Sequence, residues 1–226
     1  MKLDKRLNKI ASLIKQDATL VDIGCDHGYL AIYLALNNRI NYAYASDINQ
    51  GPLDNVRKNV ERYNVNDKIS CILSNGLQEF KTITFDTIVI AGMGGSLIVE
   101  ILENQFDLLE DKHLILQPNI NSYGLRKWLI KNNFLIVNEL LVEENDIIYE
   151  IIEVNTSLKS IAYSELELLF GAHNLMKNTV ELYSKMKNYL NKMEKIIENL
   201  PKNNEKYDAY VERINLIKEY LLNENK

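Results

Sequence analysis

The sequence predicts an α/β fold, with a seven-stranded sheet as far as about residue 154 and a helical domain behind it. Short apolar runs alternate with segments of helical periodicity up to Val154, a pattern typical of a parallel sheet with crossover helices. The last two apolar runs of this region are separated only by Glu144-Asn145-Asp146, and heptad spacing follows from residue 176 onward. These three observations indicate one domain of residues 1–154 and a second of residues 155–226.

The first domain is expected to contain five parallel strands, at residues 19–23, 42–47, 69–74, 85–91 and 113–118. Helical periodicity between and after these strands predicts helices near residues 28–37, 52–63, 97–105 and 122–132. The remaining apolar runs, 134–143 and 147–154, are too close together for a parallel crossover. We therefore expect them to complete the sheet as an antiparallel hairpin.

The second domain is predicted to be helical, with a short helix at 164–170 that ends at Gly171. Apolar residues then alternate at spacings of three and four from Met176 to Leu200, and again from Tyr207 to Leu221. Because Pro201 interrupts the pattern, two helices are expected to fold back as an antiparallel coiled coil, the first about 37 Å long. This coiled coil either packs against protein, in this chain or in a second subunit, or grips RNA.

Composition and charge narrow the classes of protein. Of 226 residues 46% are hydrophobic and 25% charged, as in globular proteins. Cys25 and Cys71 are too few for a disulfide framework and are not spaced as metal ligands, which indicates a reducing compartment and no metal site. The charged start and the lack of a long apolar run predict a cytoplasmic protein that does not bind membranes. A net charge of -5 argues against a wholly basic nucleic-acid binder, although seven lysines against four glutamates in 177–206 leave a local basic face open.

Glycines and aspartates alternate where the first strand turns into the next helix. The segment Asp22-Ile23-Gly24-Cys25-Asp26-His27-Gly28 has the pattern D-x-G-x-D-x-G, in which the glycines can adopt positive φ and admit a ligand close to the backbone. Asp26 stands at the second glycine of the dinucleotide fingerprint G-x-G-x-x-G, where its charge would oppose a pyrophosphate. S-adenosylmethionine has no phosphate and is cationic at its ammonium and sulfonium groups. The loop therefore favours this cofactor over NAD, with ordinary turn glycines as the alternative.

Polar or small residues follow the other parallel strands as well. Asp47 ends the second strand, where an acidic side chain binds a ribose diol or caps the next helix. Asn75-Gly76-Leu77 follows the third strand, where Asn75 could meet an adenine amine and Leu77 cover the ring. Ala91-Gly92-Met93 opens a glycine-rich turn after the fourth strand. After the fifth strand, Asn119 either orients a target base or, with Pro118, only ends the strand.

Together these motifs resemble the bacterial tRNA (adenine-22-N1)-methyltransferase family. The resemblance is carried by D-I-G-x-D-H-x-Y-L at 22–30, Asn75-Gly76-Leu77, I-A-G-M-G-G at 90–95 and L-Q-P-N at 116–119. It implies a class I methyltransferase (Rossmann-like) sheet followed by a coiled-coil domain, S-adenosyl-L-methionine as cofactor and tRNA as partner. Asn75 stands where the family usually has Asp, and its carbonyl oxygen can still accept a hydrogen bond from the adenine amine.

The expected reaction is methyl transfer to N1 of an adenine in tRNA, at position 22 by this resemblance. N1 attacks with a ring lone pair, so alignment and stabilisation of positive charge on the adenine matter more than a base. We expect Asp26 and Asn119 to be catalytic. The residues that we expect to bind the cofactor are Asp22, Gly24, His27, Gly28, Asp47, Asn75, Gly76, Leu77, Ala91, Gly92 and Met93.

Several alternatives stay open. Many amino-group methyltransferases carry D/N-P-P-Y/F after the fourth strand, whereas Ala91-Gly92-Met93-Gly94 stands here, which favours a ring nitrogen as target. Tyr29 and Tyr123 are stacking partners for a base or ordinary packing residues. Lys5, Arg6 and Lys9 share one helix face that contacts phosphate or only solvent. Other functions are a methyltransferase for another RNA, a protein or a small molecule, and an inactive RNA-binding scaffold. A monomer or a weak dimer is expected.

Overall fold

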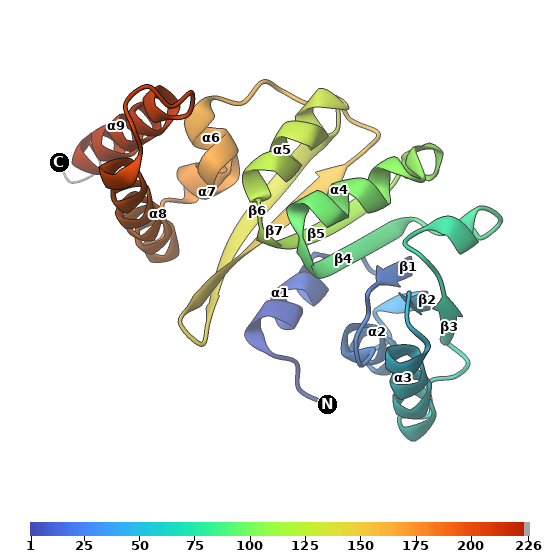
Figure 1. Cartoon of the computed structure of the whole chain (residues 1–226). Coiled ribbons are helices and arrows are strands. Elements are labelled where there is room, and N and C mark those ends of the chain that lie inside the picture. Colours follow the sequence, from blue (N-terminus) through green and yellow to red (C-terminus); the bar gives the residue numbers. More distant parts are fainter. Residues whose placement is uncertain (224–226) are drawn as a thin grey trace. The chain divides into compact units, whose positions relative to one another are not determined.

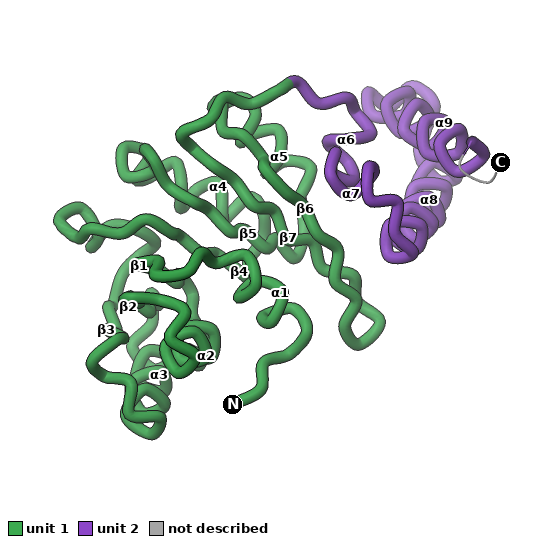
Figure 2. The backbone as a smooth tube through the Cα atoms, turned by 180° about the vertical axis from the view of Figure 1, so that it is seen from behind, with its two compact units in different colours: residues 1–161 green, residues 162–226 purple. Residues whose placement is uncertain are grey.

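The computed structural model describes residues 1–223 and divides into two compact units (Figure 2). Unit 1 spans Met1–Ile161 and unit 2 begins at Ala162. Among the described residues, no helix is both long and apolar enough to cross a membrane.

The division between the units lies after Ile161, whereas the sequence analysis expected a boundary after Val154. The segment that follows the last strand stays with unit 1 because it is hydrogen-bonded to it. Leu135 N donates to Leu158 O (3.2 Å), and Ser160 N donates to Asn133 O (3.3 Å). Neither of these hydrogen bonds belongs to a strand ladder. The apolar pattern of the sequence therefore does not predict that the segment after Val154 stays with unit 1.

Unit 1 is built on one seven-stranded sheet with the order β3-β2-β1-β4-β5-β7-β6 (Figure 1). Its strands are β1 Ala18–Ile23, β2 Ile40–Asp47, β3 Ile69–Leu73, β4 Thr87–Gly94, β5 His113–Ile120, β6 Leu135–Glu144 and β7 Ile147–Asn155. The first five pair in parallel, and β7 pairs antiparallel with both β5 and β6. The predicted seven-stranded sheet with a terminal antiparallel hairpin is confirmed.

The turn of this hairpin consists of two residues. Glu144 pairs with Ile147 across the hairpin, and Asn145 and Asp146 between them have φ values of 51° and 62°. Positive φ at both central positions is what a type I′ turn requires, and Asn and Asp adopt it more readily than most residues. The short gap between the apolar runs thus predicts the antiparallel pairing correctly.

Five α-helices accompany the sheet in unit 1, namely α1 Lys5–Leu13, α2 Tyr29–Leu36, α3 Gln50–Arg62, α4 Gly95–Glu103 and α5 Ser122–Lys131. Two short 3-10 helices, η1 Gln78–Phe80 and η2 Phe106–Leu109, follow β3 and α4. Helix α4 starts at Gly95, directly after β4 and earlier than the predicted residue 97. A Cβ on Gly95 would lie 2.4 Å from Asn121 O, so glycine lets α4 start against the turn between β5 and α5.

The central strands are buried on both faces, as expected of parallel strands covered by helices. In β1, β4 and β5 the residues without exposed surface include Leu20, Val21, Ile88, Val89, Ile90, Leu114, Ile115 and Leu116. One charged cluster shares this interior. Arg126 of α5 donates from Nε to Glu139 Oε1 (2.6 Å) and from Nη2 to Glu150 Oε2, and Ser122 Oγ also donates to Glu150. The cluster joins the start of α5 to both strands of the hairpin.

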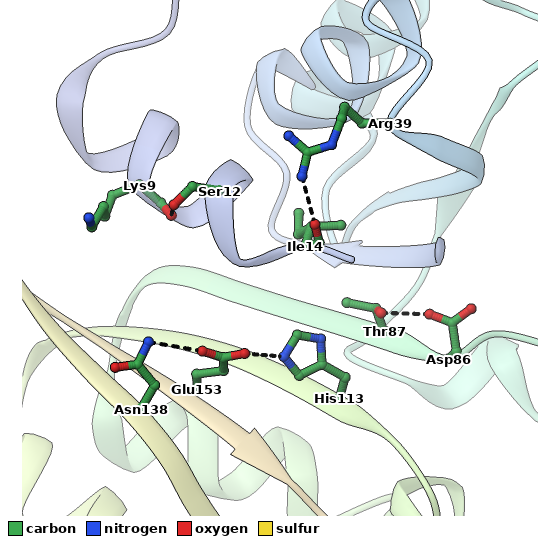
Figure 3. A network of polar contacts seen from close by, with 9 residues as sticks. All are labelled: Lys9, Ser12, Ile14, Arg39, Asp86, Thr87, His113, Asn138 and Glu153. Carbon is green, nitrogen blue, oxygen red and sulfur yellow. Dashed lines mark hydrogen bonds and ion pairs between the residues drawn. The ribbon is translucent and has the colours of Figure 1, made fainter. Parts of the chain in front are cut away.

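Hydrogen-bonded polar side chains connect β5, β7 and β6 near the amino end of β5 (Figure 3). His113 Nε2 lies 2.9 Å from Glu153 Oε1, and Asn138 Nδ2 donates to Glu153 Oε2 (3.1 Å). The hydrogen bond from His113 keeps the pKa of Glu153 below its usual range, against the effect of partial burial. These hydrogen bonds link β5, β7 and β6 side by side, so they hold the antiparallel pair onto the parallel sheet.

Unit 2 is helical and contains α6 Glu165–Phe170, α7 Ala172–Lys177, α8 Val180–Asn199 and α9 Tyr207–Asn223. Helices α8 and α9 contact each other. The residues that these two helices bury are Leu182, Met186, Leu190, Met193, Ile214 and Ile217. The helical domain is confirmed, and its description as an antiparallel coiled coil stays a prediction.

The first long helix of unit 2 is shorter than the heptad spacing predicts. Met176 lies in α7 and is 82% exposed, and Asn178 ends α7 in a left-handed conformation with φ 50°. Thr179 then caps α8 by accepting a hydrogen bond from Leu182 N. The 20 residues of α8 span about 30 Å rather than about 37 Å.

Candidate active site

The predicted motifs meet at the carboxyl ends of β1, β2, β4 and β5. The strand order runs outward in opposite directions from β1 and β4, and such a switch point is where open α/β sheets bind ligands. A polar hollow of about 280 Å³ lies instead at the amino ends of the strands, lined by residues that include Lys15, Asp86 and His113. It contains none of the motif residues, so we place the candidate site at the switch point.

The loop after β1 depends on its two glycines. Gly24 N donates to Ser46 O (2.8 Å), which ties the loop to β2, and Gly28 N donates to Cys25 O (2.7 Å). Gly24 and Gly28 have φ values of +69° and +71°, and a Cβ on Gly28 would lie 2.6 Å from Val56 Cγ1 of α3. Another residue at Gly28 would therefore be strained and would also push α3 away.

Gly24 also brings the loop after β1 into contact with the glycine-rich end of β4. A Cβ on Gly24 would lie 2.2 Å from the Met93 Cε atom, so the Met93 side chain fills the space that this glycine leaves. Residues 22–28 and 91–95 therefore form one continuous surface, although they are far apart in the sequence.

Asp22 is a buried acidic residue next to this surface. It precedes the last residue of β1, and only 5% of its surface is exposed. Burial raises the pKa of Asp22 to about 7. Burial likewise raises the pKa of the Cys25 thiol far above its usual range, and the charges of Asp22 and Asp47 raise it further. Cys25 therefore stays a protonated packing residue, and a carboxyl with so perturbed a pKa at a sheet edge marks a candidate functional group.

Asp47, the last residue of β2, is half-buried and turned toward the following loop. Its Oδ1 accepts a hydrogen bond from Asn49 N (2.8 Å). The N-cap of α3 is Asn49 and not Asp47, which argues against the interpretation of Asp47 as the helix cap. Within residues 1–223 no hydrogen bond to Oδ2 of Asp47 is formed, so this oxygen can accept one from a ligand.

The turn after β3 lies beside Asp47, because Ser74 N donates to Asp47 O (3.0 Å). Asn75 is exposed at the tip of this turn and Gly76 has a φ of 61°. Leu77 is completely buried, which differs from the expectation that its side chain covers a bound ring. Its side chain instead anchors the turn in the core. Gly76 is buried as well, so Asn75 is the exposed residue of the Asn75-Gly76-Leu77 segment.

The sequence predicts a turn from Ala91 onward, but β4 continues to Gly94 with an irregular register around Gly92. Two carboxamide side chains from β5 hold this irregular end of β4. Gly92 N donates to Gln117 Oε1 (3.1 Å), and Asn119 Nδ2 donates to Gly92 O (2.7 Å). Gln117 Nε2 also donates to Asn119 Oδ1 (3.0 Å), and Arg6 Nη1 donates to Gln117 Oε1 (2.5 Å). Asn119 is thus more than the end of a strand, because its side chain fixes the glycine-rich end of β4 beside Met93.

From the sequence, Gln117 is expected only to supply a polar group at this edge, and Arg6 to contact phosphate or solvent. Gln117 has no exposed surface, and a polar residue directly after the buried Leu114-Ile115-Leu116 run was the available signal. No local pattern predicts the contact of Arg6, because α1 and β5 are joined only by the tertiary fold.

Asp26 and His27 form an exposed rim above the glycine loop. Asp26 has a φ of 47°, its side chain is 81% exposed, and its Oδ1 lies 3.7 Å from His27 Nε2. The His27 ring stacks on Tyr29, with 5.2 Å between the ring centroids and 28° between the planes. Among residues 1–223 there is no group of three or more His, Cys, Asp or Glu that could hold a metal ion.

Comparison with known proteins identifies the family. A sequence model described as tRNA (adenine(22)-N(1))-methyltransferase matches residues 20–219. The tRNA (adenine(22)-N(1))-methyltransferase of Bacillus subtilis (strain 168) is 39% identical over 172 residues, which cover 76% of this chain and 72% of that protein.

Solved structures agree over nearly the whole chain. Streptococcus pneumoniae Sp1610 in complex with S-adenosyl-L-methionine is 36% identical, with a TM-score of 0.89 over 97% of this chain and 100% of that one. The M. capricolum TrmK complex with S-adenosyl-homocysteine is 37% identical, with a TM-score of 0.88 over 97% of this chain and 98% of that one. With its sheet, its glycine loop and its helical second unit, this chain belongs to the tRNA (adenine(22)-N(1))-methyltransferase family.

Proposed function

We propose that this chain transfers a methyl group from S-adenosyl-L-methionine to N1 of an adenine in tRNA, at position 22 as the family description states. The observation that carries the proposal is the convergence at one sheet edge of the buried Asp22 carboxyl, Asp47 and the contact between Gly92 and Asn119. When bound, the cofactor supplies an electrophilic methyl group on a sulfonium. The chain's own residues bind and orient the reactants.

Asp22 and Asp47 suit a ligand that is cationic at one end and carries a diol elsewhere. A buried carboxyl regains its charge when a cation comes close, which fits Asp22 to the methionyl part of the cofactor. The Oδ2 oxygen of Asp47 is available for ribose hydroxyls. The other residues that we assign to the cofactor lie around these two carboxyls, in the loop after β1, the turn after β3 and the end of β4: Gly24, His27, Gly28, Asn75, Gly76, Ala91, Gly92 and Met93.

Asp26 and Asn119 are the residues that we assign to the target adenine. Positive charge grows on the adenine as its N1 lone pair attacks, and an acceptor for the N6 amine stabilises that charge. Asp26 is our choice for this acceptor, while Asn119 orients the base. Because the Asp26 side chain is 81% exposed, its charge acts at full strength only after bound tRNA excludes water from the rim.

The target adenine has to leave its base pair before it can react, because N1 lies on the Watson–Crick edge. Tyr29 is 40% exposed and already stacked on His27, so its ring offers a flat surface to a base that has swung out. Ile120, at the end of β5, is 72% exposed and adds an apolar surface at the same edge. We assign both residues to the rim that receives the base.

The tRNA extends well beyond one base, and the lysines of residues 177–206 give unit 2 a basic segment that could contact phosphates. We propose that the protein acts on tRNA as a monomer or weak dimer in the cytoplasm. The two free thiols, Cys25 and Cys71, are compatible with a reducing compartment.

The test is transfer of a labelled methyl group into an unmodified tRNA transcript, followed by mapping of the modified base. A matched transcript with guanine at position 22 is the control. Label at N1 of adenine 22, absent from the control, supports the proposal. Label elsewhere in both transcripts identifies another RNA target, and cofactor binding without any transfer indicates an inactive scaffold.

A further inference from the structure

Helix α1 brings Arg6 to the target side of the candidate site. The helix is capped by Asp4, whose Oδ1 accepts a hydrogen bond from Leu7 N (2.6 Å), and Lys5 N donates to Glu144 Oε1 (2.7 Å) on the hairpin. The Arg6 guanidinium carbon lies 5.5 Å from the centre of the Tyr149 ring. These contacts hold the Arg6 side chain on β7 with its guanidinium against Gln117. Lys9 of the same helix is exposed to solvent instead.

Arg6 and Gly92 are connected by a series of hydrogen bonds through Gln117 and Asn119, and each bond in the series has only one possible direction. A guanidinium and a backbone N–H can only donate, so the Gln117 oxygen must face Arg6 Nη1 (2.5 Å) and Gly92 N (3.1 Å). The Gln117 amino group then has to donate to Asn119 Oδ1 (3.0 Å). At the far end Gly92 O can only accept, and Asn119 Nδ2 donates to it (2.7 Å). Both ends of the series therefore impose the same orientation on the two carboxamides.

This orientation determines what Asn119 presents at the exposed edge. Its oxygen keeps one lone pair and its nitrogen one hydrogen, because one of each is used within the series. A freely rotating carboxamide would present either group at either place. The same contacts hold both the N–H and the C=O of Gly92, whose φ is +79°.

We propose that Arg6 is a positioning residue for methyl transfer, acting through Gln117 to orient Asn119 and the Gly92 peptide toward the target adenine. This inference rests on the proposed function, because it takes Asn119 and the Gly92 end of β4 as the target side. Arg6 itself touches neither substrate nor cofactor. A role in phosphate binding is the competing explanation, and it makes opposite predictions for tRNA affinity.

Two variants interrupt this series of hydrogen bonds at different places. Arg6→Met removes the donor at its start. Gln117→Glu keeps the acceptor for Arg6 and Gly92 N but removes the donor to Asn119 Oδ1, so the Asn119 carboxamide should turn its amino group toward the new carboxylate. Lys9→Met is the matched control, because it removes a cation from an exposed position of the same helix.

The variants are compared in kcat, in tRNA affinity at two salt concentrations and in cofactor affinity by calorimetry. Arg6→Met and Gln117→Glu should each lower kcat by about 10- to 100-fold, the range for a misplaced group near the reacting atoms. Both should leave tRNA affinity, its salt dependence and cofactor affinity within about two-fold of Lys9→Met, and Arg6→Met combined with Gln117→Glu should lose little more than either alone. Unchanged kcat, or weaker tRNA binding with a shallower salt slope in Arg6→Met, would overturn the inference.

A second measurement does not depend on activity. The side-chain amide resonances of Gln117 and Asn119, followed by NMR, should both move in Arg6→Met and remain in place in Lys9→Met. Unmoved resonances refute the positioning role even if the wild type transfers no methyl group, whereas moved resonances with an inactive wild type refute the proposed function alone.

Discussion

Cofactor affinity is expected to depend on pH through Asp22. Burial raises the pKa of this carboxyl from its ordinary value of 3.8 to about 7, so near neutral pH the free protein is a mixture of protonated and ionised forms. Only the ionised form attracts the cationic methionyl part of S-adenosyl-L-methionine. The apparent dissociation constant is then the intrinsic value divided by the ionised fraction, which is about 0.9 at pH 8 and about 0.1 at pH 6. We expect affinity to be about ten-fold weaker at pH 6 than at pH 8.

The assay is isothermal titration calorimetry from pH 6 to pH 8, repeated in two buffers with different ionisation enthalpies. Binding below pH 7 should release close to one proton, because the bound cation favours the ionised carboxylate. Asp22→Asn is the matched variant, since it keeps the shape and removes the titration. The amino group of the cofactor titrates in both proteins, so the difference between their pH profiles isolates Asp22. S-adenosyl-homocysteine lacks the sulfonium charge, and a smaller pH effect with it would locate the attraction at the sulfonium.

The same carboxyl should affect stability in the absence of cofactor. Because the pKa of Asp22 is higher in the folded than in the unfolded chain, the folded protein binds more protons between about pH 4 and pH 7, and its stability falls as pH rises through that window. Three pKa units correspond to about 4 kcal/mol, so Asp22→Asn should stabilise the free protein at pH 8 by up to that amount. Equal pH profiles of cofactor binding for the wild type and Asp22→Asn, together with equal free energies of unfolding at pH 8, would refute this account of Asp22.

Three further substitutions test other parts of the structure. Asp47→Ala should weaken S-adenosyl-L-methionine binding by about 1–3 kcal/mol through lost hydrogen bonds to the ribose, and an unchanged dissociation constant in calorimetry would remove Asp47 from the cofactor site. Asp26→Ala should lower turnover by about 10²-fold with cofactor affinity changed only a few-fold; loss of both together would move Asp26 to the cofactor side. Arg126→Met removes the ion pairs to the buried Glu139 and Glu150 and should cost about 3–5 kcal/mol in urea unfolding, whereas a change below about 1 kcal/mol would contradict this account of the ion pairs.

The sheet and the motif loops follow from the sequence because local patterns encode them. Short apolar runs predict the strands, helical periodicity predicts the helices, and the short gap at Glu144-Asn145-Asp146 predicts the final hairpin. The helix break at Asn178 was missed although its local signals were present. Thr179 is a favourable N-cap and Glu181 an acidic residue of the first turn, and both compete with a heptad pattern that continues through them.

The contacts that complete the site depend on tertiary placement. Helical periodicity puts Lys5, Arg6 and Lys9 on one face of α1, but it contains no information about what that face meets. Arg6 faces inward only because α1 packs on the hairpin of β6 and β7. The burial that raises the pKa of Asp22 likewise comes from surrounding elements, and an aspartate at a strand end looks the same in sequence whether it is buried or exposed.

The strand order explains why the two halves of the site depend on different kinds of interaction. The residues that we propose for the cofactor come from β1, its neighbours β2 and β4, and the turn after β3, so backbone turns and two carboxyls would build that half. The proposed target half lies over β5, next to the antiparallel pair of β7 and β6. Side chains would build it, and α1 supplies Arg6 from outside the sheet. Met93 belongs to both halves, because its end of β4 is held by Asn119 and its side chain fills the space over Gly24. A disturbance of the hydrogen-bond chain from Arg6 should therefore reach the proposed cofactor side through this end of β4.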